Sequence, residues 1–147
     1  MYAFTAELDL PMDQAIDKLK AALASHKLGV VSEVDVQAIM KAKMNHDIAP
    51  YKILGICGPG YARRVIEADP DMGALLPCGC AVYESAPGKT RVALQNPNTV
   101  AAVTDKTAAL EAMTEARVAL EQVIGTCSSP DPEMTGGGAE EYISRRP

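Results

Sequence analysis

Runs with strand-like and helix-like hydrophobic patterns alternate along this chain, and their order limits the folds that it can adopt. Apolar or alternating runs suited to strands occupy residues 2–8, 30–34, 51–57, 74–84 and 90–96. Segments with helical periodicity separate the first four runs, and a longer one follows the fifth. This order predicts a two-layer α+β sandwich in which helices cover one face of a mixed β-sheet of about five strands.

The expected helices have recognisable ends. Pro11 suits the first turn of a helix that reaches about Lys27, and Gly29 follows where a left-handed terminator is expected. Asp35 is suited to cap a short second helix. We expect this helix to turn one apolar stripe inward. The stripe comprises Val36, Ile39, Met40 and Met44.

Length and composition predict one domain and exclude a membrane span. Residues 1–127 are expected to form a single α+β domain, and residues 128–147 a flexible C-terminal tail rich in Pro, Gly and charge. The chain contains no apolar run near the roughly 18 residues that a membrane span requires. Its first residues, MYAFTAELDL, lack the features of a secretory signal, so we expect a cytoplasmic protein with reduced cysteines.

The charge balance argues against nucleic acid as a partner. The formal net charge is -5, and the basic residues are scattered along the chain. Binding to phosphate backbones depends on clustered Lys and Arg. Aromatic residues make up only 4% of the sequence, with no Trp, which leaves few side chains for base stacking. We therefore expect no nucleic-acid partner.

Three of the four cysteines lie between residues 51 and 84, at or beside predicted strands. Cys78 and Cys80 are two residues apart, so a strand would present both sulfurs on one face. Cys57 ends a strand that we expect nearby. Three thiolates suit a soft ion, copper(I) or zinc(II), and the fourth zinc ligand is left open between His46, Cys127 and a group from a second subunit.

Two other functions fit the same cysteines. Cys57 stands in CGPG directly before a helix, where unpaired N–H groups favour a reactive thiolate. A persulfide or mixed disulfide on Cys57, resolved by Cys78 or Cys80, would make the protein a redox protein or sulfur carrier. Alternatively, the cysteines are buried small hydrophobic residues, and a pocket between sheet and helices binds a small ligand. Whether the protein is an enzyme stays open.

Several phrases of the sequence resemble one known family. They are LGVVSEVDVQAIMKAKM, YKILGICGP, EADPDMGALLPC, VYE and QNP, in this order. With this spacing, residues 1–125 look like the domain-of-unknown-function 302 family. The resemblance implies a small α+β domain that forms homodimers, and it implies no particular activity.

The resemblance also bears on individual cysteines. Cys57 and Cys78 stand where the family pattern commonly carries cysteine. The family tends to have Asn and then an aliphatic residue where Gly79 and Cys80 stand in this sequence. The third thiol is therefore a departure, which implies a specialised subgroup.

Overall fold

The computed structural model describes residues 1–128 as the nine expected strands and helices, together with two further short helices. The strands are β1 (Ala3–Leu8), β2 (Gly29–Asp35), β3 (Tyr51–Cys57), β4 (Cys78–Ala86) and β5 (Lys89–Gln95). The helices are α1 (Met12–Ala24), α2 (Val36–Met44), α3 (Pro59–Ala68), the 3₁₀ helix η1 (Pro70–Leu75), α4 (Asn98–Ala101) and α5 (Thr107–Ser128). Most of the expected tail, residues 129–147, lies outside the described residues.

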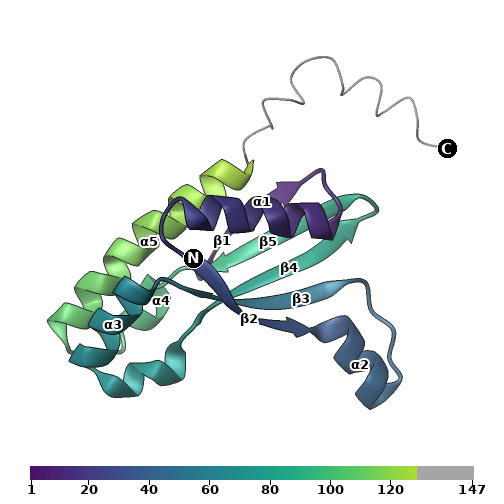
Figure 1. Ribbon diagram of the computed structural model, residues 1–147. Helices are drawn as coiled ribbons and strands as arrows, with labels where there is room; N and C mark the ends of the chain where they lie inside the picture. The colour runs from purple at the N-terminus through teal and green to yellow at the C-terminus, as the bar shows by residue number, and fades with distance from the viewer. Residues whose placement is uncertain (129–147) are drawn as a thin grey trace, which may run out of the picture.

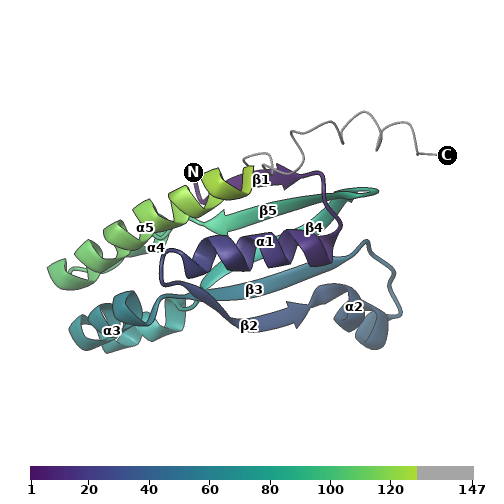
Figure 2. The same ribbon diagram turned by 45° about the horizontal axis from the view of Figure 1, so that its top comes forward.

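The five strands form one sheet in the order β1-β5-β4-β3-β2, and α1 and α5 pack on one of its faces (Figures 1 and 2). The predicted two-layer α+β fold is confirmed. The expectation of a mixed sheet was wrong, because all four strand pairings are antiparallel. Helix α2 connects β2 to β3, and α3 connects β3 to β4; in both cases the two connected strands are neighbours in the sheet. The one crossover, from β1 through α1 to β2, joins strands at opposite edges that do not pair.

The main core lies between the sheet and the two long helices. Alternate residues of the inner strands face the helices, and the leucines of α1 and α5 fill the space between the layers. The largest fully buried members are Leu19, Leu23, Leu54, Leu94 and Leu120. Within residues 1–128, no helix is both long and apolar enough to cross a membrane.

Helix α2 is not part of this core. Figure 1 shows it projecting from the body beyond one end of the sheet, and in this described segment no residue is buried. The Asp35 carboxylate caps it by accepting the Ala38 N–H at 2.9 Å, as expected. The expected inward stripe was wrong, since Ile39 and Met44 are 45% and 70% exposed and no second layer lies against them.

The opposite end of the sheet is closed by helices. There α3 packs against α5, and a bidentate ion pair joins the Arg64 guanidinium to the Glu115 carboxylate. Val65 of α3 and Met113 of α5 belong to a second buried cluster beyond the sheet. Leu76, just before β4, packs against both clusters. The junction of the two clusters therefore lies where β3 ends and β4 begins.

Candidate functional site

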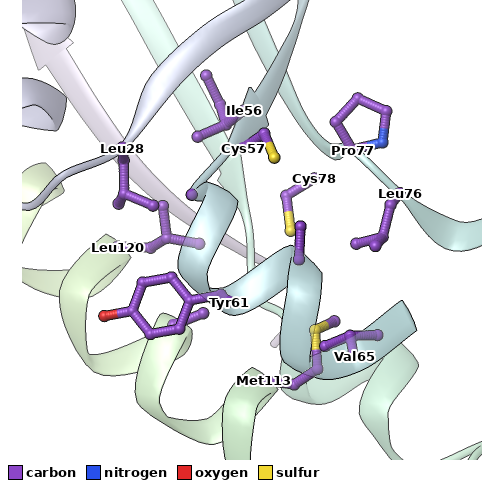
Figure 3. Close-up of a pocket in the computed structure, with 13 residues that line it drawn as sticks. Leu28, Ile56, Cys57, Tyr61, Val65, Leu76, Pro77, Cys78, Met113 and Leu120 are labelled. Carbon is purple, nitrogen blue, oxygen red and sulfur yellow. The ribbon is translucent and has the colours of Figure 1, made fainter. Parts of the chain in front are cut away.

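A small pocket lies at this junction, between the ends of β3 and β4 and the helices α3 and α5 (Figure 3). Its volume is about 40 Å³. Among the described residues that line it, none carries a charged side chain. The wall includes three sulfur-bearing residues, Cys57, Cys78 and Met113. The Tyr61 hydroxyl points away from both cysteines in Figure 3, so the surroundings of the sulfurs are apolar.

Cys57 is the last residue of β3 and the only partly exposed cysteine among the four free thiols. Its neighbour Ile56 faces the helices, so alternation along the strand turns Cys57 toward the outer side of the sheet. Because the strand ends there, Cys57 still borders the pocket. Gly58 is the N-cap residue of α3 and provides no side-chain cap. The first N–H groups of that helix have no intrahelical acceptor and favour negative charge nearby.

Cys78 is the first residue of β4 and lies opposite Ile56 in the antiparallel register. Its side chain is buried, with 8% of its surface exposed. Burial, together with the smaller effect of the nearby charge of Cys57, raises the pKa of the Cys78 thiol to about 11. Cys78 is therefore a protonated thiol at neutral pH, within electrostatic range of Cys57.

Cys80 lies on the same face of β4 as Cys78, as expected for a strand, but it does not line the pocket. It sits in the core between Leu54 and Leu94 of the neighbouring strands. Burial, together with the smaller effect of the charge of Cys127, raises the pKa of Cys80 to about 12. Cys127, in the last turn of α5, is itself buried with a raised pKa. The cysteines thus form two pairs, Cys57 with Cys78 and Cys80 with Cys127.

His46 is not near either pair within this chain. It follows α2 at the exposed end of the molecule, whereas Cys57 stands at the other end of β3. Seven strand residues separate the two ends by roughly 20 Å at about 3.3 Å per residue. Across residues 1–128, no group of three or more His, Cys, Asp or Glu side chains is placed to hold a metal ion. The structure therefore brings together only two of the four expected ligands, Cys57 and Cys78.

Met113 is the sulfur-bearing pocket residue that sequence reasoning did not identify. In the sequence it is one member of the apolar stripe of the last helix, which marks it as a core residue. No local motif connects it to Cys57 or Cys78, which lie more than thirty residues earlier. Only the packing of α5 against α3 and the sheet end brings its thioether to the pocket.

These features define a small antiparallel α+β domain with a sulfur-lined pocket at one end of its sheet. Residues 4–127 match the family described as Domain of unknown function DUF302, and the chain belongs to this family. The chain is also similar to a solved structure, that of an uncharacterized conserved DUF302 protein from Bacillus stearothermophilus. The TM-score is 0.77 and the identity 24%, over 86% of this chain and 98% of that chain. No curated protein matches the chain.

The family match confirms the resemblance that the sequence suggested, and the similar structure supports the fold alone. The homodimer and the cytoplasmic location stay predictions.

Proposed function

We propose that this protein binds one soft metal ion, copper(I), in the pocket between β3, β4, α3 and α5, with the thiolates of Cys57 and Cys78 as ligands. The observation that carries the proposal is that two thiols from neighbouring strands line one small pocket without charged side chains. Thiolates select Cu(I) and Zn(II) over Mg(II) and Ca(II), because soft ligands prefer soft ions.

The size of the pocket favours a single ion over an organic ligand. A volume of about 40 Å³ exceeds the roughly 10–15 Å³ that one water molecule requires by only a few fold. Pockets for drug-sized ligands are typically about 300–1,000 Å³. This supports metal binding over the small-ligand module that the sequence also allowed.

The ligand set favours copper(I) over zinc(II). Structural zinc sites are almost always four-coordinate, and the described residues place only two of the thiols at the pocket. Two thiolates around Cu(I) leave one net negative charge, which the start of α3 beside Cys57 would stabilise. Binding displaces the Cys78 proton, so the raised pKa of Cys78 predicts that copper affinity increases with pH up to about pH 11.

An anaerobic Cu(I) titration against a coloured chelator tests the proposal. We expect one equivalent per chain in the native protein, and loss of this tight binding in both Cys57→Ser and Cys78→Ser. Cys80→Ser is the matched control, because Cys80 lies two residues from Cys78 but outside the pocket. The proposal is wrong if the native protein takes up no copper, or if only Cys80→Ser loses it.

The partial exposure of Cys57 favours a second candidate function, transfer of sulfur. The Cys57 thiolate would attack the outer sulfur of a hydrodisulfide, R–S–S–H, to give Cys57–S–S–H and release R–S⁻. The Cys78 thiol could then form a Cys57–Cys78 disulfide and release H₂S, which uses no further oxidant. Intact mass after treatment with a persulfide donor should show one added sulfur at Cys57. Equal labelling of all four cysteines would contradict this candidate.

A further inference from the structure

We infer that Met113 is the third ligand of the proposed metal site, and that its thioether makes the site select copper(I) over zinc(II). This inference rests on the proposed function, and it adds a residue that neither the cysteine pattern nor the family match singles out.

The position of Met113 carries the first step. Its side chain is 2% exposed and lines the same pocket as Cys57 and Cys78. In Figure 3 the Cys78 side chain points from β4 toward the helix layer, the side on which the Met113 sulfur lies. All three sulfur-bearing residues therefore belong to the wall of one pocket of about 40 Å³.

The chemistry of the thioether carries the second step. Methionine sulfur is a soft ligand that suits Cu(I), whereas zinc sites in proteins use Cys, His, Asp and Glu. The thioether is neutral, so it completes three-coordinate copper without adding charge to a pocket that has no charged wall. Met113 would therefore strengthen copper binding and leave zinc binding almost unchanged.

The alternative explanation is that Met113 only fills space. Methionine is flexible and often occupies irregular gaps in cores. Met72 provides a comparison within the same chain, because it belongs to the same buried cluster and is 3% exposed, but it does not line the pocket. Leucine is close to methionine in volume, so Met113→Leu and Met72→Leu should both fold, with small and similar changes in thermal stability.

The first test is copper affinity, measured by chelator competition on the native protein and on both methionine variants. Removing a residue that only orients a metal-binding side chain typically lowers metal affinity by about 10–100-fold. Removing a side chain that binds the metal itself should therefore lower affinity by at least about tenfold. We expect this loss in Met113→Leu for Cu(I) and little change for Zn(II). Met72→Leu should bind both ions like the native protein.

The second test detects the bond between the Met113 side chain and copper directly. X-ray absorption at the copper edge of selenomethionine-labelled protein should show selenium bonded to copper, and this signal should vanish in Met113→Leu and persist in Met72→Leu. Copper binding that needs both cysteines but shows no selenium neighbour would overturn the role of Met113 and leave the proposed function standing. A native protein without copper binding would overturn both.

Discussion

Cys78 and Cys80 lie two residues apart on the same face of β4, yet each belongs to a different sulfur pair. Cys78 shares a pocket with Cys57, whereas Cys80 is buried in the core in electrostatic range of Cys127. The CxC spacing therefore combines one thiol at the pocket with one that packs between the sheet and the helices. This division leads to distinct expectations for the four cysteines.

The first prediction concerns thiol reactivity. We expect limiting iodoacetamide to modify Cys57 before the other cysteines in the native protein, because only Cys57 is partly exposed. The buried thiols should react only as the protein unfolds. Peptide mapping after short labelling measures the order, and labelling in urea is the control. Early modification of Cys80 or Cys127 would contradict the structure.

The second prediction concerns stability at alkaline pH. The pKa of a cysteine is 9.0 in the unfolded chain, about 11 for folded Cys78 and about 12 for folded Cys80. Between these values the unfolded chain loses protons that the folded protein keeps. The stabilisation that these two buried thiols give the folded protein is thus complete below pH 9 and is lost as the pH rises toward 11–12. Over this range the free energy of unfolding should fall by roughly 1.4 kcal/mol per pH unit for each thiol.

Urea unfolding of the native protein and of Cys80→Ala between pH 8 and 11 measures this effect. At pH 8 the variant should have a lower free energy of unfolding than the native protein, because a buried side chain is truncated. Its stability should fall less steeply with pH, because one of the titrating thiols is gone. Parallel curves for the two proteins would exclude Cys80 as a source of the pH dependence.

The third prediction concerns the entry of α3. A Cβ at Gly58 would lie 2.6 Å from Leu28 Cδ2 and 2.7 Å from Tyr61 Cδ2, and both residues line the pocket. Gly58→Ala should therefore displace these side chains and lower copper affinity. Gly60→Ala is the matched control, because a Cβ there meets no atom within 4 Å. Equal copper affinities in the two variants would show that the pocket does not need this close packing.

The fourth prediction concerns the sheet beneath the pocket. A Cβ at Gly55 would lie 2.2 Å from Ser32 Oγ and 2.5 Å from Pro77 Cγ. Gly55→Ala should lower the free energy of unfolding by about 1–3 kcal/mol, the usual cost of overpacking. Gly79 is the register partner of Gly55, and a Cβ there meets nothing within 4 Å. Chemical unfolding should therefore show little loss for Gly79→Ala, and a similar loss in both variants would contradict this account.

Local patterns in the sequence predicted most of the fold. The periodicity of residues 12–24 and the alternation at 51–57 are local properties, and the structure has a helix and a strand there. The directions in which the strands pair depend on residues that are far apart in the sequence. Local patterns therefore did not show that every pairing is antiparallel, and the sheet was expected to be mixed. The apolar stripe of α2 was misassigned for a related reason, since periodicity shows which residues share a face but not whether anything covers it.

The candidate site was predictable only in part. The position of Cys57 at a strand end and of Cys78 in a strand followed from the sequence, but their shared pocket depends on the register of β3 with β4. His46 was one of the candidates for the fourth ligand, but strand β3 lies between His46 and Cys57 and carries them to opposite ends of the sheet. Met113 reaches the pocket from a distant helix, which no spacing rule reveals.

Backbone amide NMR of the protein before and after one equivalent of Cu(I) tests the central claim most directly, because this ion is diamagnetic and leaves every signal readable. We predict that the largest shifts cluster at Cys57, Gly58, Cys78 and Met113, with small shifts around Cys80 and Cys127. The largest shifts near His46 or at the Cys80–Cys127 pair would place the ion elsewhere and contradict the proposed site.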